Sequence, residues 1–407
     1  MRLLILTQYF APEIGAPQAR LAAIARELRV RGHAVEVVTA MPHHLAERTF
    51  PGYRGRLYVR ESMDGITVHR SWVFAATGTG VRRMASYLSF TLSCLIGLMR
   101  AKRPDAIFVE SPPLFLSLPG WIFARLFGAR LIFNVADLWP DSVRELGVLR
   151  GGPLLRAAEL LERWTYARAA VVNAATDGIA SVLRERKGVH PRKIVPLPNG
   201  IDVARFTPRP PDEVLVRDLG LEGRPVVLYA GTHGIAQGLL GVLEAAEELG
   251  DDALLLCIGA GPVKAAMQAF ATQRGLHNVR FLAPVPLDEM PRYLSLARAS
   301  IVPLVRTPLM ASARPSKIFP SLACGVPVIY SGEGESAALI ERAQAGLVVP
   351  PEDPPALAQA IRRIVRDDAL RARLAMNARN LAVERFAWSA IVGTWLAALA
   401  NGSPGLV

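Results

Sequence analysis

Short apolar runs, each followed by a glycine-containing loop and a helical segment, recur through both halves of this 407-residue chain. The first run, residues 2–7, leads into a loop and then into an expected helix over residues 18–31. A second run, residues 34–39, completes a strand–helix–strand unit. Repetition of such units predicts a parallel sheet with helices on both faces.

The same pattern restarts after a proline-rich segment, residues 197–211. Residues 225–229 and residues 254–258 are apolar runs that each lead into a glycine loop. The chain is also too long for one hydrophobic core. We therefore expect the α/β class, with two doubly wound, Rossmann-like domains. Ligands bind at the carboxyl ends of parallel strands, so the predicted site lies in a cleft between the domains.

We expect domain boundaries where the pattern is interrupted. Residues 1–197 form the predicted N-terminal domain, and residues 198–385 form the C-terminal domain. Residues 386–407 are apolar and are expected to form a helix that packs back across the junction.

The positive charge of the chain is concentrated in one half. The net charge is +12, and residues 1–200 hold 27 basic against 15 acidic residues, whereas the rest holds 20 of each. This excess predicts an anionic partner, either a membrane surface or a phosphate-bearing substrate. Nucleic acid is not expected, because the basic residues are scattered and accompany no recognisable binding motif.

The cysteines and the amino terminus indicate the compartment. Cys94, Cys257 and Cys324 are far apart and match no metal-ligand spacing, which predicts a reducing environment. The first residues turn polar too soon for a signal peptide and fit a first strand. We therefore expect a cytoplasmic protein. His43 and His44 lack companion ligands, so no metal site is expected.

Residues 314–335 carry the strongest local signal for an anion site. A helix is expected over residues 316–324, because a proline precedes it and a glycine follows it. Arg314, Ser316 and Lys317 stand at its amino end, where a helix attracts phosphate. The alternative for Lys317 is a solvated cation. We favour function, because the chain uses 42 Arg and only 5 Lys.

A strand over residues 327–330 and a glycine–acid loop containing Glu333 and Glu335 follow. Carboxylates in such a loop suit sugar hydroxyls. Phosphate beside sugar hydroxyls indicates a nucleotide sugar.

Residues 84–99 form an apolar stretch bracketed by basic residues. It is shorter than the roughly 20 residues that a membrane-spanning helix needs. Two interpretations remain, a buried core helix and a helix at the membrane interface. We favour the second, with the basic residues of the 82–103 segment on anionic lipid.

Six motifs, spread over residues 2–395, together resemble glycosyltransferase family 4. They are Tyr9-Phe-Ala-Pro-Glu-Ile-Gly15, Arg31-Gly-His-Ala-Val-Glu-Val-Val-Thr, Asp137-Leu-Trp-Pro-Asp141, Pro198-Asn-Gly-Ile-Asp, Tyr229-Ala-Gly with Ala236-Gln-Gly-Leu, and Pro315-Ser-Lys-Ile-Phe. The likeness is greatest to the O-antigen and colanic-acid, L-fucosamine-transferase-like subgroup. It implies the GT-B fold, retention of anomeric configuration, and neither a cofactor nor an obligatory metal. A UDP- or GDP-sugar donor and a lipid-linked saccharide acceptor in surface polysaccharide or lipopolysaccharide synthesis are implied as well.

The resemblance also assigns the donor side of the site. Lys317, aided by Arg314 and by backbone amides, would stabilise the departing diphosphate. The donor-binding candidates are Gly231, Thr232, Gly234, Gln237, Gly259, Gly261, Ser316, Glu333 and Glu335. Many family members carry an arginine and a lysine in the loop after residue 230, whereas this chain has Thr232 and Gln237 there. Ordinary strand-to-helix turns are the alternative reading of these glycine loops.

On the acceptor side, Asp137 is the ionisable residue nearest the place where the family often has a histidine. Its alternative role is to cap the next helix. Gly15, Ala16, Arg20 and Trp139 are the acceptor-side candidates.

One residue departs from the family pattern. Pro320 stands where the family usually has a glutamate for the donor's ribose, so Glu333 or Glu335 would have to replace it, or donor binding is weakened. Two other functions stay open, a nucleotide-sugar epimerase of the same fold and a nucleotide-sugar-binding protein with weakened catalysis.

Overall fold

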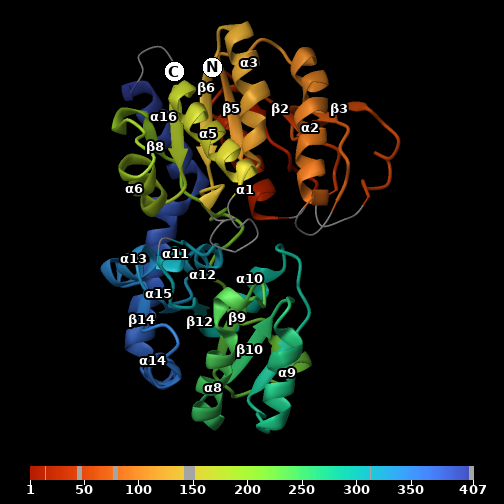
Figure 1. Ribbon diagram of the computed structural model, residues 1–407. Helices are drawn as coiled ribbons and strands as arrows, with labels where there is room; N and C mark the ends of the chain where they lie inside the picture. Colours follow the sequence, from red (N-terminus) through yellow and green to blue (C-terminus); the bar gives the residue numbers. More distant parts are fainter. Residues whose placement is uncertain (14, 44–47, 77–80, 142–151, 312, 403–407) are drawn as a thin grey trace. The chain divides into compact units, whose positions relative to one another are not determined.

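The computed structural model describes residues 1–13, 15–43, 48–76, 81–141, 152–311 and 313–402. The chain divides into two compact units (Figure 1). The first comprises Met1–Asn199 together with Ile391–Val407, and the second comprises Gly200–Ala390. The first unit is therefore discontinuous in sequence.

The first unit contains an eight-stranded sheet with the order β3-β4-β2-β1-β5-β6-β7-β8. Its strands are β1 Arg2–Leu6, β2 Ala34–Ala40, β3 Tyr58–Met63, β4 Ile66–Ser71, β5 Ala106–Ser111, β6 Arg130–Val135, β7 Val171–Ala174 and β8 Ile194–Pro196. Neighbours are parallel except for β3 and β4, which form an antiparallel pair. The predicted parallel sheet is confirmed, and β3 adds an antiparallel edge strand that the prediction did not include.

Helices cover both faces of this sheet. They are α1 Ala16–Val30, α2 Val81–Arg100, α3 Ser117–Phe127, α5 Pro153–Arg168, α6 Asp177–Glu185 and, at the end of the chain, α16 Trp388–Gly402. Connections between parallel strands are right-handed, so the direction of a connection along the sheet decides which face its helix covers. The connections that contain α2, α3 and α5 run toward β8 and place these helices on one face. The connection from β1 to β2 runs in the opposite direction and places α1 on the other face. Within the first face, α3 contacts both α2 and α5 (Figure 1).

The carboxyl-terminal helix α16 belongs to the core of the first unit from Ile391 onward. The Trp395 side chain is fully buried, and its ring packs edge-on against Phe108 at 6.0 Å between centroids. Its Nε1 donates a hydrogen bond to Asn173 Oδ1 at 3.0 Å. The predicted helix over residues 386–407 begins later, at Trp388, because Ala387 is extended and pairs with Ile201.

The second unit contains a six-stranded parallel sheet with the order β11-β10-β9-β12-β13-β14. Its strands are β9 Val226–Ala230, β10 Leu254–Ile258, β11 Val279–Leu282, β12 Ala297–Pro303, β13 Val328–Ser331 and β14 Gly346–Val349. Its α-helices are α7 Glu213–Asp218, α8 Leu239–Leu249, α9 Lys264–Gln273, α10 Met290–Leu294, α11 Pro308–Ala311, α12 Ile318–Ala323, α13 Glu335–Ala343, α14 Pro354–Arg366 and α15 Asp368–Leu381.

The helix predicted over residues 316–324 is α12, which is one turn shorter and begins after Lys317. Across both units, no helix among the described residues is long and apolar enough to cross a membrane.

Candidate functional site

The loops that follow β9 and β10 lie against each other at the carboxyl edge of the second sheet. The Gly231 amide donates to the Ile258 carbonyl at 3.0 Å, and the His233 amide donates to the Ala260 carbonyl at 2.9 Å. The Val263 amide in turn donates to the His233 carbonyl at 3.1 Å. These three hydrogen bonds join the two loops into one backbone surface.

Two glycines permit this close approach. A Cβ atom on Gly259 would lie 1.9 Å from the Gly231 carbonyl oxygen, and one on Gly261 would lie 2.3 Å from the His233 carbonyl oxygen. Gly259 also has a φ of 146°, which side chains disfavour. Both positions therefore require glycine for the packing of the loops, whatever ligand they hold.

A lysine that sequence reasoning missed ties the second loop to the end of β11. The Lys264 ammonium donates to the Gly259 carbonyl at 2.7 Å and to the Leu282 carbonyl at 2.6 Å. The rarity of lysine, which singled out Lys317, was equally available as a signal for Lys264. We interpret Lys264 as a positioning residue that orders the loop carrying Gly259 and Gly261.

Lys317 lies beside the first of these loops. Its ammonium stands 5.2 Å from the centre of the Tyr229 ring, and a Cβ on Gly231 would lie 2.8 Å from its Cε. The Tyr229 hydroxyl donates to the Thr232 carbonyl at 2.5 Å, which fixes the ring beneath the ammonium. The structure thus brings together Lys317, Gly231 and the backbone of Thr232, and their role in binding a diphosphate stays a prediction.

Lys317 carries its charge in a partly buried position. Burial lowers the pKa of Lys317 to about 8, and no carboxylate in the described part of the chain forms an ion pair with it. Burial and the nearby positive charges of Lys264 and Lys317 also lower the pKa of His233, so this imidazole adds no charge at neutral pH. A partly buried cation that no described carboxylate neutralises is suited to an incoming anion.

Arg314, in contrast, has an acidic partner. Its guanidinium forms an ion pair with the carboxylate of Glu335, and both side chains are largely buried. The guanidinium also stands 5.8 Å from the centre of the Phe386 ring. Because Glu335 offsets the charge of Arg314, the predicted assistance of Arg314 to the diphosphate stays a prediction.

The other donor-side candidates are more exposed. The Glu333 carboxylate pairs with Arg306 at 3.3 Å, and Ser316 and Thr232 also lie at the surface. A Cβ on Gly234 would lie 2.5 Å from Gln237 Oε1, so Gly234 leaves room for that side chain.

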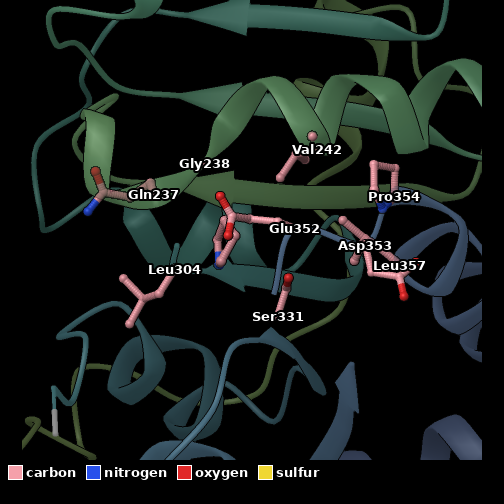
Figure 2. Close-up of a pocket in the computed structure, with 11 residues that line it drawn as sticks. Gln237, Gly238, Val242, Leu304, Ser331, Glu352, Asp353, Pro354 and Leu357 are labelled. Carbon is pink, nitrogen blue, oxygen red and sulfur yellow. The ribbon is translucent and has the colours of Figure 1, made fainter. Parts of the chain in front are cut away.

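Gln237 borders a depression of about 270 Å³, a volume that includes space open to solvent (Figure 2). Its lining comes from the first turns of α8 and α14 and from the ends of β12 and β13, and comprises Gln237, Gly238, Gly241, Val242, Pro303, Leu304, Ser331, Glu352, Asp353, Pro354 and Leu357. Lys317 is not part of this lining. The predicted donor residues therefore divide between the Lys317 surface and this depression.

In the first unit, Arg20 lies inside the fold. Its side chain is 4% exposed, and its guanidinium forms an ion pair with Glu110 and a 3.4 Å hydrogen bond with Asn199. The Asn134 amide donates to Glu110 at 2.9 Å. Burial nevertheless raises the pKa of Glu110, against the opposing effects of Arg20 and Asn134. Since its charge is used within the core, we interpret Arg20 as a structural residue, and its acceptor role stays a prediction.

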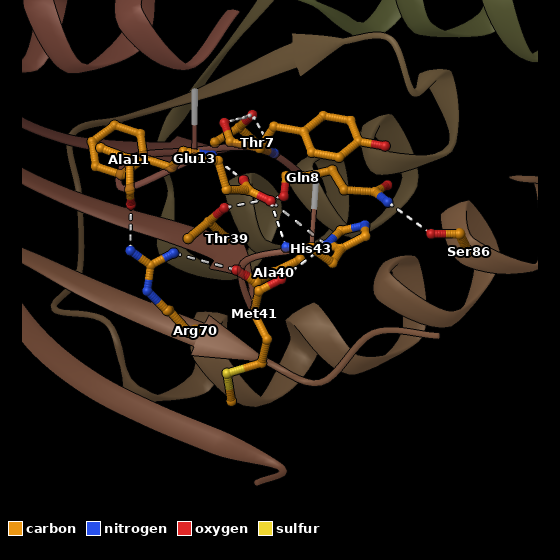
Figure 3. A network of polar contacts seen from close by, with 12 residues as sticks. Thr7, Gln8, Ala11, Glu13, Thr39, Ala40, Met41, His43, Arg70 and Ser86 are labelled. Atoms are coloured by element: carbon orange, nitrogen blue, oxygen red, sulfur yellow. Dashed lines mark hydrogen bonds and ion pairs between the residues drawn. The ribbon is translucent and has the colours of Figure 1, made fainter. Parts of the chain in front are cut away.

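The loop after β1 is held by a network of buried polar groups (Figure 3). Glu13 accepts hydrogen bonds from the amides of Phe10 at 3.1 Å and His43 at 2.7 Å. His43 Nδ1 lies 2.8 Å from the Met41 carbonyl, so this imidazole serves the loop structure. Gly15 precedes α1, which begins at Ala16, and these two acceptor-side candidates therefore stand at a helix amino end.

Asp137 and Trp139 follow β6. Asp137 is exposed, whereas Trp139 is buried and its ring packs edge-on against Phe115 at 5.8 Å. Trp139 is thus a core residue of the first unit, and any effect on an acceptor would be indirect.

Comparisons with known proteins decide the family. Residues 15–200 match the model described as "Glycosyl transferase 4-like domain", and residues 212–381 match "Glycosyl transferases group 1". The chain belongs to glycosyltransferase family 4. This glycosyltransferase is 29% identical over 346 residues to WcaI of Escherichia coli (strain K12), named as a colanic acid biosynthesis glycosyl transferase. The aligned region covers 82% of this chain and 84% of WcaI. It is 30% identical over 301 residues to the 2-deoxystreptamine glucosyltransferase of Streptomyces kanamyceticus, and this aligned region covers 70% of the present chain and 74% of that enzyme.

Solved structures share the GT-B fold of this glycosyltransferase. Sucrose-phosphate synthase from Thermosynechococcus elongatus superposes with a TM-score of 0.75 at 19% identity, over 99% of this chain and 100% of that one. WaaG, a glycosyltransferase involved in lipopolysaccharide biosynthesis, gives a TM-score of 0.65 at 18% identity over 99% and 100% of the two chains.

Pro320, the departure from the family pattern, fits the helix of this glycosyltransferase without strain. It is the third residue of α12, where a backbone N–H has no partner within the helix, and its carbonyl accepts from Cys324 at 3.0 Å. Glu333 and Glu335, the predicted replacements, both pair with arginines. Among the residues with assigned positions, no group of three or more His, Cys, Asp or Glu side chains could hold a metal ion.

Proposed function

We propose that this glycosyltransferase moves a sugar from a nucleotide-diphosphate sugar to a saccharide acceptor, with retention of anomeric configuration. One observation carries the donor assignment. Lys317 is a partly buried lysine beside the Gly231 loop, and none of the described carboxylates forms an ion pair with it. As the glycosidic bond breaks, the diphosphate gains negative charge, and the Lys317 ammonium would stabilise it.

The donor is proposed to be a UDP- or GDP-sugar. Anabaena HepE, a neighbour with a TM-score of 0.72 and 19% identity, was solved with UDP and glucose, which supports a nucleotide-sugar donor. In this proposal the loops of Gly231 and Gly259 hold the nucleotide side, and Glu333 and Glu335 face the sugar or ribose hydroxyls.

The acceptor is proposed to be a lipid-linked saccharide in surface polysaccharide synthesis. The names of WcaI and WaaG, which refer to colanic acid and lipopolysaccharide, support this class. The protein would act as a peripheral protein on the inner face of the cytoplasmic membrane, with residues 82–103 on anionic lipid.

A donor screen tests the proposal. The protein is incubated with UDP- and GDP-sugars, with and without lipid-linked acceptors, and release of nucleoside diphosphate is followed. Release that requires the acceptor, with a product of unchanged anomeric configuration, is the expected result. Conversion of the donor alone would indicate an epimerase, and tight binding without turnover would indicate a binding protein.

The pH profile of the reaction should report the Lys317 ammonium. Because burial lowers its pKa to about 8, donor kcat/KM should be level below that pH and decrease above it as the charge is lost. Well above the pKa, donor kcat/KM should decrease about tenfold for each pH unit. A bound diphosphate favours the charged form, so the decrease in kcat at saturating donor should begin at a higher pH.

The matched variant is Lys317→Arg, whose guanidinium stays protonated in this range. The alkaline decrease in kcat/KM should disappear in it. An identical decrease in Lys317→Arg would assign the titration to another group.

A further inference from the structure

The outer face of α2 is apolar along the whole helix. Val81, Leu88, Leu92 and Met99 are exposed by 87%, 45%, 71% and 66%, and they recur at the spacing of one helix face. The opposite face is also apolar and packs into the core through Phe90, Cys94 and Leu98, among others. A surface helix normally presents polar residues to water, so this outer stripe lacks its ordinary environment.

The helices beside α2 continue this apolar surface. Leu118, Ile122 and Leu126 on α3 are exposed by 39%, 44% and 69%, again at helical spacing. On α5, Leu160 is 66% exposed. The three helices lie on the same face of the sheet, where α3 contacts both α2 and α5 (Figure 1). The two apolar stripes of α2 and α3 and the single side chain of Leu160 therefore belong to one layer.

Two tryptophans join α3 to α5. Trp121 and Trp164 pack edge-on with their ring centres 5.1 Å apart, and both are only partly buried. The Arg168 guanidinium stands 5.9 Å from the centre of the Trp121 ring. Tryptophan beside arginine at the edge of an apolar surface is typical of the zone between lipid headgroups and acyl chains.

The charge around this layer is mostly positive. Its acidic residues on the three helices are Glu159 and Glu162 of α5, and Glu162 is buried and pairs with Lys187. Neither α2 nor α3 contains an acidic residue. The basic residues on and beside the three helices are Arg82, Arg83, Arg100, Lys102, Arg103, Arg125, Arg156, Arg163 and Arg168. A second copy seated on this face would bring like charges together, whereas an anionic bilayer complements them.

We propose that the outer faces of α2, α3 and α5 form one docking surface for an anionic lipid bilayer. The apolar side chains enter the boundary between headgroups and acyl chains, and the basic residues contact the headgroups. The inference rests on the proposed use of a lipid-linked acceptor and extends the contact from the 82–103 segment to α3 and α5. No helix needs to span the bilayer for this mode of binding.

Vesicle sedimentation of the full chain tests this surface. The double variant Ile122→Gln/Leu126→Gln, which leaves α2 intact, should bind phosphatidylglycerol-containing vesicles at least about tenfold more weakly. The matched control Leu240→Gln/Met376→Gln changes exposed apolar residues of α8 and α15 and should bind like the parent protein. Unchanged thermal unfolding would show that both variants fold.

Three outcomes would overturn the proposal. If the α3 variant binds normally while replacement of Arg82, Arg83, Arg100, Lys102 and Arg103 by Gln releases the protein, docking is confined to the 82–103 segment. If neither variant changes vesicle binding, the layer does not contact lipid. If the α3 variant dissociates an oligomer seen by light scattering, the occupant is a second copy. Transfer to a short water-soluble acceptor should persist in the α3 variant, and loss of that activity in the parent protein would count against the proposed function instead.

Discussion

Replacing Lys317 by Ala should lower kcat by roughly two to three orders of magnitude, the range found when one group that stabilises developing negative charge is removed. In the proposed reaction, charge accumulates on the departing diphosphate. Lys317 is a partly buried cation beside the Gly231 loop and has no acidic partner among the described residues, whereas the Lys264 ammonium is already bound to two carbonyls. Arg314 cannot replace it easily, because its guanidinium already pairs with Glu335.

The measurement is steady-state release of nucleoside diphosphate at saturating donor and acceptor. Arg298→Ala is the matched control, since it also removes one positive charge from the second unit. Arg298 stands near the amino end of β12, whereas the glycine loops follow the carboxyl ends of the parallel strands, and it pairs with Asp368 at 3.1 Å. A kcat in Lys317→Ala equal to that of the control would remove Lys317 from the mechanism.

Gly259→Ala should disrupt the donor side of the second unit. The added Cβ would lie 1.9 Å from the Gly231 carbonyl oxygen, and neither backbone can move without breaking the hydrogen bonds that join the loops. We expect the free energy of unfolding to decrease by about 2–3 kcal/mol, as for other overpacked sites. Donor affinity should weaken at least about tenfold. A tenfold change corresponds to about 1.4 kcal/mol, and the free-energy cost that we expect for displacing the loop is larger than this.

Gly275→Ala separates crowding from backbone strain. Gly275 also has a positive φ, 62°, but an added Cβ would meet no atom within 4 Å. Thermal or urea unfolding and donor titration should therefore show a smaller loss of stability and normal donor binding in Gly275→Ala. Equal effects of the two substitutions on donor affinity would contradict the role given to the contact between the loops.

The parts of the fold that the sequence predicted are those with strong local signals. Residues 254–258 are all apolar and form β10 with the predicted bounds, because a strand buried on both faces needs no polar residue. The hairpin of β3 and β4 was missed, since Arg60, Glu61 and Ser62 form a polar run within β3 and give neither an apolar run nor a regular alternation. The turn between these strands contains Asp64 and Gly65, both at positive φ. Asp-Gly between two strands is a hairpin signal that was present in the sequence.

The candidate site divides in the same way. The proximity of Lys317 to the glycine loops was predictable. The glycine loops follow β9 and β10, and Lys317 precedes α12, a helix whose amino end stands at the same edge of the parallel sheet. The pairing of Arg314 with Glu335 and the two carbonyl contacts of Lys264 depend on how separate loops pack. Arg20 and Glu110 are 90 positions apart in the sequence, and no local sequence pattern around either residue indicates that they form a buried ion pair.

The membership of α16 in the first unit has a consequence for synthesis of the protein. Domains made early on the ribosome usually fold while the rest of the chain is still being translated. Here the hydrogen bond to Asn173 Oδ1 and the ring contact with Phe108 cannot form until Trp395 has been translated, which happens after the whole second unit. The unit that begins the chain is therefore the last to be completed, and a nascent chain released before residue 391 would leave its core open to water.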